Sequence, residues 1–353
     1  MATTSLIDGL TCPVPFASTD RIQLGHGSGG KMSATLFRER ILPHFDNPAL
    51  AVLGDAAVFR VPATELAIST DSFVVSPLEF PGGNIGSLAV HGTLNDLAMM
   101  GARPFCLTAG FVLEEGLPFD QLDRIVAAMA AAARRADVPI VAGDTKVVER
   151  GKADGLYINT TGVGVLHVGA RPGPRGARVG DAILVSGPIG RHGMAIMATR
   201  ESTGFETGIE SDSASLWPVV APLLNQLGPA IHVLRDPTRG GVASALNEIA
   251  QAAGVGIELE ESSLPIPAAV QAGCEMLGLD PLYVANEGIL VAMVPETCAT
   301  AALKCLRADP LGAEAAVIGR VVDDHRGFVV LHTSMGGTRI VDMLPGDQLP
   351  RIC

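Results

Sequence analysis

Apolar and polar positions along the first third of the chain follow the periods of strands and helices in turn. Runs of strand character cover 51–53 and 65–69, and each lies close to an aspartate. Residues 84–100 predict a helix, with Asn84 as its N-cap and Gly101 just past its end.

The same alternation continues to about residue 168. A strand is expected at 105–113 and a helix from about Pro118. Four apolar residues of that helix fall on one face at helical spacing: Leu122, Ile125, Val126 and Met129. Strands at 138–142 and 156–168 complete a half that is rich in β–α–β units.

A segment rich in glycine, proline and arginine, 169–180, predicts a linker. A second alternating half begins at Asp181 and runs to about Asp342. We therefore predict an α/β (α+β) chain with two cores. Its expected parts are an N-terminal arm at 1–40, an N-terminal domain at 41–168, a C-terminal domain at 178–342 and a mobile tail at 343–353.

Composition agrees with two domains. The length of 353 residues exceeds what one core usually serves. Hydrophobic residues make up 48% and charged residues 18%, which excludes an intrinsically disordered chain. The net charge is −12 and no basic block occurs, so nucleic acid is not an expected partner.

The N-terminus lacks the basic start and apolar run of a secretion signal, and no apolar stretch is long enough to cross a bilayer. The 6 cysteines form no CxxC pair and no zinc-like spacing with histidine. We expect a cytoplasmic protein with free thiols and no membrane partner.

The segment Gly25-His-Gly-Ser-Gly-Gly-Lys31 has the chemistry of a phosphate-binding loop. Glycines let backbone N–H groups converge on phosphate oxygens, and Lys31 adds a positive charge. The spacing matches most of a P-loop, but Met32 replaces the Ser or Thr that binds magnesium. A plain flexible arm stays open as the alternative, although the scarcity of lysine in this chain favours phosphate contact.

Polar residues recur in apolar contexts near the expected ends of elements in the first half: Asp55, Asp71, Asn95, Asp96 and Asp144. Magnesium takes oxygen ligands and commonly bridges carboxylates to substrate phosphates. A carboxylate in an apolar context is costly unless it is paired or bound to metal. Each aspartate alone is typical of a helix or turn cap, but their recurrence without nearby lysines favours a metal–phosphate site.

In the second half, Asp236 precedes a helix expected at 238–252, where it either caps the helix or serves as a ligand. Gly240 and Gly241, in the first turn of that helix, allow close approach by another backbone or a ligand. Glu287 lies at a turn that leads into a strand, a position where glutamate is usually solvated.

The chain ends on Cys353, at the tip of a tail whose prolines and glycine suit neither a helix nor a central strand. A thiolate is a nucleophile that holds acyl-type groups, so a thiol on a mobile peptide can carry such a group between sites. The alternative is a cysteine that merely falls last.

Together these passages resemble a known family over most of the chain. The motifs GHGSGGK, LGDAA, STDSFVV, HGTLNDLAMMGARP, AGDTKVVE, GDAILVSGPIGRHG, LRDPTRGGVA and NEG resemble the superfamily of aminoimidazole ribonucleotide synthetase and selenophosphate synthetase, in which ATP activates an oxygen by phosphorylation. With the terminal PRIC, the set resembles the HypE family of hydrogenase maturation proteins, which are carbamoyl dehydratases.

The resemblance implies a fold and a set of ligands. The fold is a two-domain aminoimidazole ribonucleotide synthetase-like subunit that forms a homodimer. The N-terminal domains contribute strands to a shared β-barrel, and each C-terminal domain is a mixed sheet with helices. The cofactors are ATP and Mg²⁺. The implied ATP-binding residues are Lys31, Asp55, Asp71, Asn95, Asp96, Asp144 and Asp236, of which Asp55, Asp71, Asp96 and Asp236 are the implied metal ligands.

The implied reaction is the ATP-dependent dehydration of an S-carbamoyl group on Cys353 to a thiocyanate, which supplies the cyanide ligand of [NiFe]-hydrogenase. Lys146 and Glu287 match the positions where the family needs proton-transfer groups. The implied partners are the carbamoyltransferase HypF as donor and an iron-carrying HypC–HypD complex as acceptor.

Two alternatives stay open. The chain could be another synthetase of the superfamily that acts on a free small molecule such as selenophosphate or an aminoimidazole nucleotide. Selenophosphate synthetases carry cysteine or selenocysteine beside the glycine-rich loop, where this chain has His26 and Ser28. The second alternative is a non-enzymatic scaffold whose terminal cysteine docks metal or partners.

Overall fold

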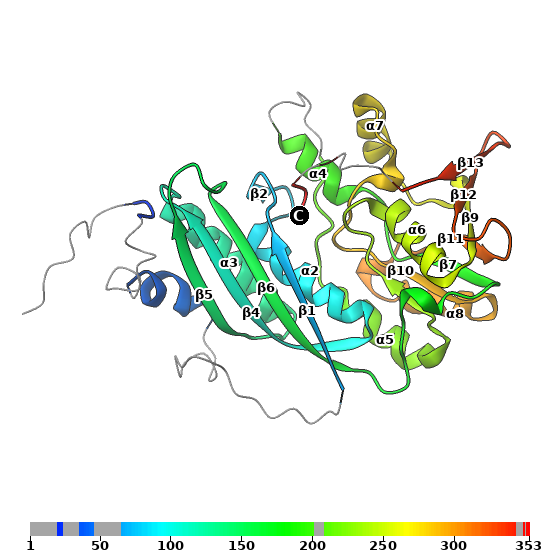
Figure 1. The fold of residues 1–353 in the computed structure, drawn as a ribbon, viewed down its shortest axis with the longest axis horizontal. Coiled ribbons are helices and arrows are strands. Elements are labelled where there is room, and N and C mark those ends of the chain that lie inside the picture. The colour runs from blue at the N-terminus through cyan, green and yellow to red at the C-terminus, as the bar shows by residue number, and fades with distance from the viewer. Residues whose placement is uncertain (1–19, 24–34, 46–64, 201–207, 344–348, 350) are drawn as a thin grey trace, which may run out of the picture.

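The structure, a computed structural model, describes residues 20–23, 35–45, 65–200, 208–343, 349 and 351–353. These residues form two α/β halves that lie side by side, with the C-terminus between them next to β2 (Figure 1). The two-domain architecture predicted from the sequence is confirmed.

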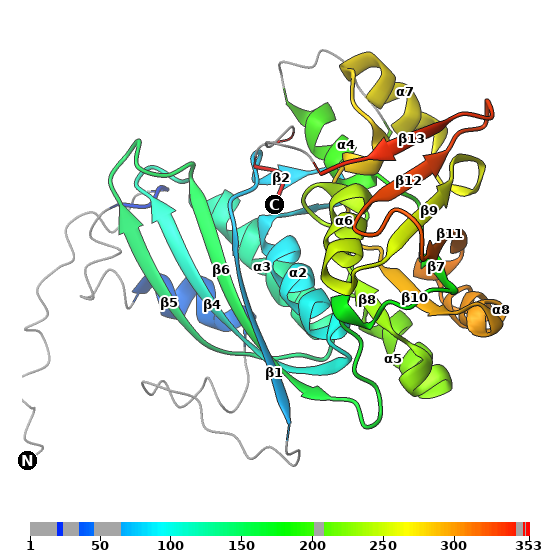
Figure 2. The same cartoon turned by 45° about the vertical axis from the view of Figure 1, so that its right-hand side comes forward.

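The N-terminal half is a four-stranded sheet with helices on one face. The strand order is β1 (Leu66–Phe73), β6 (Leu156–Leu166), β4 (Ala102–Glu114) and β5 (Ile140–Val148). Neighbouring strands are antiparallel except for β4 and β5, which run parallel and are connected through α3 (Phe119–Arg135). This helix and α2 (Ile85–Met99) lie behind the sheet, and the described residues place no helix across its opposite face (Figure 2).

The helix α2 begins where the sequence predicts. Asn84 Oδ1 accepts hydrogen bonds from Gly86 N and Ser87 N, and Ser87 Oγ accepts one from Asn84 N, which completes a capping box. Almost every residue of α2 is buried, because the helix lies between the sheet and the C-terminal half (Figure 1). Gly101 follows its end with a φ of 69°.

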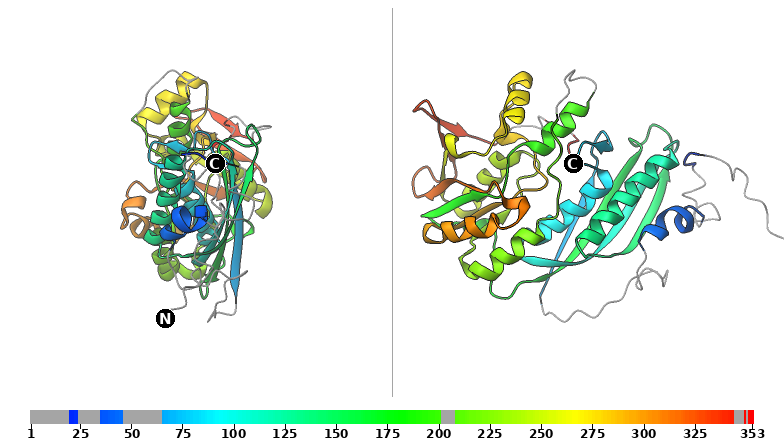
Figure 3. Two further views of the ribbon diagram at one scale, coloured as in Figure 1. Left: turned by 90° about the vertical axis from the view of Figure 1, so that its left-hand side faces the viewer. Right: turned by 180° about the vertical axis from the view of Figure 1, so that it is seen from behind.

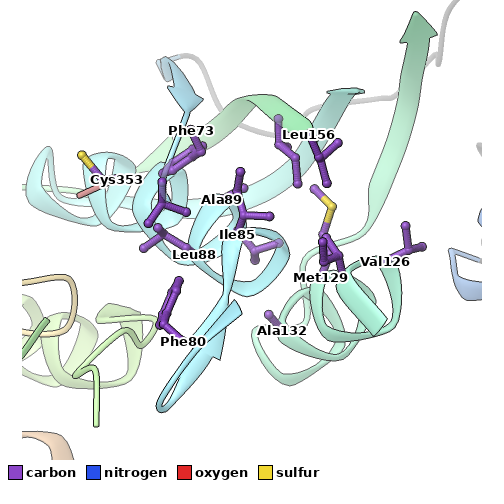
Figure 4. Packing of buried hydrophobic residues seen from close by; sticks show 14 of the residues in the cluster. Phe73, Phe80, Ile85, Leu88, Ala89, Val126, Met129, Ala132, Leu156 and Cys353 are labelled. Carbon is purple, nitrogen blue, oxygen red and sulfur yellow. The ribbon is translucent and has the colours of Figure 1, made fainter. Parts of the chain in front are cut away.

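The apolar face predicted for α3 is also confirmed, since Leu122, Ile125, Val126 and Met129 are all fully buried. They pack with α2 and the sheet in one core, part of which is seen in Figure 4. A small hairpin of β2 (Glu79–Phe80) and β3 (Gly83–Asn84) leads directly into α2.

The C-terminal half is a seven-stranded mixed sheet between two layers of helices (Figure 3). One face packs on α6, and the other packs on α5 and α8. Of the strand pairs, only β9 with β12 is parallel. The strands in order are β13 (Thr338–Val341), β12 (Val329–His332), β9 (Gly256–Glu260), β11 (Ala316–Val322), β7 (Asp181–Val185), β10 (Val291–Pro295) and β8 (Val233–Arg235). The helices are α4 (Arg191–Thr199), α5 (Trp217–Leu227), α6 (Gly241–Ala253), α7 (Ala268–Leu277) and α8 (Glu296–Leu306).

Three expectations about element ends are wrong. Asp71 lies within β1, Asp96 within α2 and Asp144 within β5. Each therefore projects from the body of an element, and none acts as a helix cap or turn residue. The expected strand at 51–53 lies outside the described residues.

The helix expected at 238–252 begins at Gly241, because Gly240 and Gly241 have positive φ angles of 76° and 62°. A Cβ on Gly241 would lie 2.4 Å from the Leu282 carbonyl oxygen, so this glycine admits the close backbone approach that the sequence predicts. Gly240 is the N-cap, and Asp236 does not cap the helix.

The described part of the N-terminal arm is not separate from the N-terminal core. Ile22 and Leu36 of the arm are buried in this core. Two short helical turns, η2 (Phe37–Ile41) and η3 (Leu42–His44), follow Leu36, and Ile41 and Phe45 are buried in the same core. None of the described helices is long and apolar enough to span a membrane.

Candidate active site

A group of carboxyl side chains meets where the two halves of the molecule join. Asp71 comes from β1 and Asp96 from α2, whereas Asp236 follows β8 and Glu287 precedes β10. The electrostatic influence of Asp71, Asp96 and Asp236 reaches Glu287, which places all four in one neighbourhood. We call these residues the junction cluster.

Strand alternation explains how β1 contributes to this cluster. Successive side chains of a strand point to opposite faces, so Ser69, Asp71 and Phe73 share the face that α2 covers. Ser69 Oγ donates a hydrogen bond of 2.6 Å to Asp96 Oδ2, which ties the strand to the helix at this level. Asp71 Oδ1 accepts a hydrogen bond of 2.7 Å from Ser72 N.

Burial raises the pKa of every member of the junction cluster, and repulsion from neighbouring carboxyl groups adds to it for Asp71, Asp236 and Glu287. Burial is the main cause for Asp236, and the nearby Asp96 adds to it, so that the pKa of Asp236 rises to about 7. Glu287 is 3% exposed, and burial together with Asp236 and Asp212 holds its pKa well above the ordinary value. The pKa values of Asp71 and Asp96 are also raised, mainly by burial.

Such a cluster suits a divalent cation bound with phosphate. Like charges held together cost free energy, and a cation that binds between them removes that cost. Within the part of the chain that the structure describes, no group of three His, Cys, Asp or Glu side chains is spaced to hold a metal ion unaided. The carboxylate oxygens of the junction cluster are ligands of the kind that Mg²⁺ takes, since Mg²⁺ usually binds one or two carboxylates and completes its shell with water and substrate phosphates.

The C-terminal residues are docked beside the junction cluster. Val74 N donates to Cys353 O and Ser76 N donates to Arg351 O, both at 3.1 Å, so the tail extends the backbone pairing beyond β1. The Cys353 side chain lies beside Phe73, which belongs to the N-terminal core (Figure 4). The tail therefore ends at the carboxyl groups and not on a remote surface.

The Cys353 thiol lies in a negative environment with one cationic partner. Its sulfur is 3.2 Å from an Arg239 guanidinium nitrogen, which donates a hydrogen bond to it. Burial, followed by the negative charge of Glu287, raises the pKa of Cys353 to about 12, while Arg239 opposes the shift. The docked residue is therefore a neutral thiol at physiological pH.

Asn95 is buried and hydrogen-bonded to three backbone groups. It is 1% exposed, and its amide nitrogen donates to the carbonyl oxygens of Ala214 and Glu287 at 3.0 and 3.3 Å. Its Oδ1 accepts a hydrogen bond of 2.8 Å from Leu216 N. These contacts favour a role in positioning the Glu287 turn over direct contact with ATP.

Asp144 and Lys146 are not brought to the junction cluster within one chain. They lie on β5, the edge of the sheet opposite β1, with β6 and β4 between. Asp144 pairs with Gly110 and Lys146 with Val112, both on the face without helices. Three strand spacings separate the two edges by about 14 Å. Asp144 and Lys146 form an exposed ion pair of 2.7 Å, which lowers the pKa of Asp144.

Two expected site residues, Lys31 and Asp55, lie outside the described residues. Sequence reasoning singled out neither Arg239 nor His192, although both stand within quoted motifs. His192 is fully buried, and its Nε2 lies 2.9 Å from the Ile352 carbonyl oxygen. No periodicity marks either residue, because each acts through a contact with the chain terminus.

Comparisons with known proteins agree with this arrangement. Two family models match: "AIR synthase related protein, N-terminal domain" over residues 53–166, and "AIR synthase related protein, C-terminal domain" over 178–332. A curated relative from Cupriavidus necator, "Carbamoyl dehydratase HypE", is 55% identical over 334 residues, which cover 94% of this chain and 95% of the relative.

Solved structures give the same result. A crystal structure of hydrogenase maturation protein HypE in complex with ATP is similar with a TM-score of 0.90 at 51% identity, covering 94% of this chain and 99% of that one. A crystal structure of a HypE–HypF complex is similar with a TM-score of 0.77 at 46% identity, covering 89% of this chain and 100% of that one. The chain therefore belongs to the HypE family of carbamoyl dehydratases, which are hydrogenase maturation enzymes of the AIR synthase-related fold.

Proposed function

We propose that this chain uses ATP to dehydrate a carbamoyl group carried on Cys353, and so forms a thiocyanate that supplies the cyanide ligand of [NiFe]-hydrogenase. The observation that carries the proposal is the docking of Cys353 against a cluster of carboxyl groups at the domain junction. The relative named carbamoyl dehydratase and the similar structure solved with ATP support it.

The chemistry explains the need for ATP. The oxygen of a thiocarbamate, Cys–S–C(=O)NH₂, is a poor leaving group. Transfer of the γ-phosphoryl group of ATP to that oxygen converts it into a phosphate, with ADP as the second product. Loss of both nitrogen protons then breaks the C–O bond, releases phosphate and leaves Cys–S–C≡N. The net change on the tail is the loss of one water.

The junction cluster would hold the magnesium-bound nucleotide. We assign Asp71, Asp96 and Asp236, with Asp55, to the metal, and Lys31 to a phosphate. When bound, Mg²⁺ neutralises charge on the transferring phosphoryl group, which is where the catalysis of such transfers mostly resides. The raised pKa values of the described members support this assignment, because a bound cation favours the charged form that burial disfavours and, at Asp71 and Asp236, also offsets repulsion from neighbouring carboxyl groups.

Glu287 is the proposed base for the amide nitrogen. Its burial among other carboxyl groups raises its pKa, which makes its carboxylate a stronger base than a solvated glutamate. Its backbone is held on both sides, since Glu287 N donates to Asp212 and Glu287 O accepts from Asn95.

Lys146 is the second proposed proton-transfer group, and we place it at the site of a partner subunit. It lies on the face of the N-terminal sheet that the described residues leave without helices, together with Asp144. On the same sheet, Leu66 and Ile68 of the edge strand β1 are 43% and 71% exposed. A homodimer in which two such sheets form a shared β-barrel would cover this face and could carry Lys146 to the other subunit's tail.

The proposed partners follow from the reaction. HypF is the proposed carbamoyl donor, which the solved HypE–HypF complex supports. A HypC–HypD complex is the proposed acceptor of the cyanide group, and the cytoplasm is the proposed compartment. The docked thiol is 9% exposed, so transfer to or from a partner requires the tail to leave its dock.

The direct test replaces the carrier. Cys353→Ala should abolish thiocyanate formation while leaving ATP affinity within about twofold, because the thiol is the acceptor and not a nucleotide contact. Cys298→Ala is the matched control, since Cys298 lies partly exposed on α8 in the C-terminal half. Formation of thiocyanate by the Cys353→Ala protein would refute the proposal and favour a synthetase that acts on a free small molecule.

A further inference from the structure

One irregular segment connects the docked tail with the Glu287 turn. Residues 208–216, which we call the strap, form neither helix nor strand and run through the domain junction. Ser211 N donates to the Pro81 carbonyl oxygen at 2.8 Å, and Ala214 N donates to the Glu287 carbonyl oxygen at 3.3 Å. The strap thus contacts the β2–β3 hairpin at one point and the Glu287 turn at another.

At one end of the strap, the His192 ring lies between the tail and Ser211. Its Nε2 is 2.9 Å from the Ile352 carbonyl oxygen, and its Nδ1 is 2.8 Å from Ser211 Oγ. A carbonyl oxygen only accepts hydrogen bonds, so Nε2 carries the proton. Burial lowers the pKa of His192 to about 4, so the ring is neutral and Nδ1 accepts from Ser211. The Phe80 ring contacts the imidazole edge-on at a centroid distance of 5.5 Å.

At the next residue, the strap holds the backbone of the Glu287 turn. The Asp212 carboxylate accepts hydrogen bonds from Glu287 N and Gly288 N, both at 3.1 Å. A Cβ on Gly288 would lie 1.7 Å from the Asp212 carbonyl oxygen, so the turn and the strap are in direct backbone contact. Two consecutive strap residues are therefore linked to opposite ends: Ser211 to the tail through His192, and Asp212 to the backbone of the proposed base.

We propose that His192 and the strap couple docking of the tail to placement of Glu287, so that the Glu287 turn is held in its observed position only while Ile352 occupies its dock. His192 and Ser211 are positioning residues in this scheme, since the hydrogen bonds of the His192 ring run to the Ile352 carbonyl oxygen and to Ser211 Oγ. The scheme rests on the proposed function for the role of Glu287, but the coupling itself is a property of the fold.

The hydrogen-bond geometry specifies a direction for the coupling. When the tail leaves, the proton on His192 Nε2 loses the Ile352 carbonyl, and nothing then selects this tautomer over the other. With a proton on Nδ1, the Ser211 hydroxyl could no longer donate to His192 and would have to turn its hydrogen away. The Ser211 hydroxyl oxygen also accepts a hydrogen bond of 3.1 Å from Ser213 N, so this change alters the strap. The change reaches Asp212 through the backbone of the strap, one residue further on.

The first experiment asks whether the strap holds the tail. In the full-length protein, without ATP or carbamoyl donor, iodoacetamide alkylation of Cys353 is followed by mass spectrometry of the C-terminal peptide. Ser211→Ala should speed alkylation about fivefold, as expected for the loss of one hydrogen bond. Ser213→Ala is the matched control, because that hydroxyl contacts His91 on α2 and should leave the rate within about twofold.

The second experiment asks whether the tail holds the turn. Ile352 is 1% exposed, so Ile352→Asp should release the tail, and Met343→Asp adds the same charge at an exposed position as a control. Hydrogen exchange at the amides of Glu287 and Gly288 should quicken about fivefold in Ile352→Asp. When Ile352→Asp is made in the Ser211→Ala protein, it should raise the exchange rate of these amides by less than about twofold, because the link from His192 to the strap is already broken.

Two substitutions of His192 separate its contact with the tail from its contact with Ser211. A Gln at 192 can place its amide near Nε2 and keep the tail contact, whereas an Asn can only reach the Nδ1 position and keep the Ser211 contact. Alkylation of Cys353 should therefore be faster in His192→Asn than in His192→Gln, with similar melting temperatures for the two variants.

Equal effects of Ile352→Asp on the Glu287 turn with and without the Ser211 hydroxyl would overturn the coupling. So would an alkylation rate in Ser211→Ala within twofold of the parent protein. Because neither experiment uses ATP or a carbamoyl group, such a failure would leave the proposed dehydration untouched, and a failed dehydration would leave the coupling untouched.

Discussion

The molecule contains two groups of charged residues, the junction cluster and the Asp144–Lys146 pair, whose compositions and surroundings are opposite. The junction cluster contains only carboxyl groups, lies between the two halves, and has raised pKa values. Asp144 and Lys146 on β5 neutralise each other, are more than half exposed, and have a lowered pKa at the carboxyl group. An exposed pair of this kind contributes little to stability. The difference indicates that the first group awaits a positive ligand, whereas the second is stable in solvent.

The surroundings of the two groups differ as well. The junction cluster draws carboxyl groups from both halves of one chain, and the docked tail of the same chain lies next to it. The β5 pair lies on the sheet face across which the described residues place no helix. We infer that the nucleotide site is largely assembled within a subunit, and that Lys146 reaches a site only across a dimer.

Removal of a carboxyl group from the junction cluster should have the largest effect. Asp96→Ala should lower magnesium-dependent ATP turnover by about 1000-fold, because a metal ligand that stabilises the transferring phosphoryl group is lost. Steady-state phosphate release measures this. Asp120→Ala is the control, since Asp120 pairs with Arg124 on the outer surface of α3. Turnover close to that of the control would mean that the cluster is not the metal site.

Replacement of the exposed lysine should have a smaller effect with a distinctive rescue. Lys146→Met should slow thiocyanate formation about 100-fold through the loss of a proton-transfer group, whereas Lys152→Met, another exposed lysine, should not. When Lys146→Met and Cys353→Ala subunits are mixed and allowed to exchange, about a quarter of the parent activity should return. Half of the dimers are then mixed. In each mixed dimer one of the two sites is complete, because the Lys146→Met subunit supplies Cys353 and the Cys353→Ala subunit supplies Lys146.

The mixing experiment discriminates between the two regions directly. If Lys146 served the tail of its own chain, no mixed dimer would contain a complete site and the mixture would stay inactive. That result would place both charged groups in the site of one subunit, and the difference between the two regions would no longer separate a site within one subunit from one shared across a dimer.

The remaining expected effect is on stability and not on activity. Asp236 has its pKa raised from 3.8 to about 7, mainly by burial. A carboxyl group with a raised pKa destabilises the folded state increasingly as pH rises from about 4 to about 7. Without magnesium, Asp236→Asn should therefore stabilise the protein by about 4 kcal/mol at pH 8, at about 1.4 kcal/mol per pKa unit, and leave it almost unchanged at pH 4. Chemical denaturation at the two pH values measures this, and equal changes at both would contradict the role of charge.

Much of the fold could be predicted from local patterns. The start of α2 followed from Asn84 and its end from Gly101, since capping depends on neighbouring residues. The buried face of α3 followed from helical spacing. The motifs also placed Asp71, Asp96, Asp236 and Glu287 in one site, although no pattern of spacing alone would have done so.

The position of Asp144 could not be predicted, because it depends on one register shift. Ile140 pairs with Leu107, but a shift between Leu107 and Thr108 then pairs Asp144 with Gly110. Without that irregularity, Asp144 would pair with Phe111 on the helix-covered face. A change of one residue in register exchanges the two faces of a strand.

The binding position of the C-terminal residues could not be predicted from the sequence either. Its contacts run to the backbone of Arg351, Ile352 and Cys353, from residues more than 100 positions away in the sequence. Backbone contacts of this kind leave no pattern in residue type. Only the terminal cysteine itself was visible in the sequence.

The central claim is that Cys353 carries the group on which ATP acts. The most direct measurement is the mass of the C-terminal peptide after incubation with a carbamoyl donor, before and after addition of ATP. We predict a gain of one carbamoyl group on Cys353, followed by the loss of one water once ATP is added. A peptide that stays unmodified, or one that keeps its carbamoyl group while ATP is consumed, would contradict the claim.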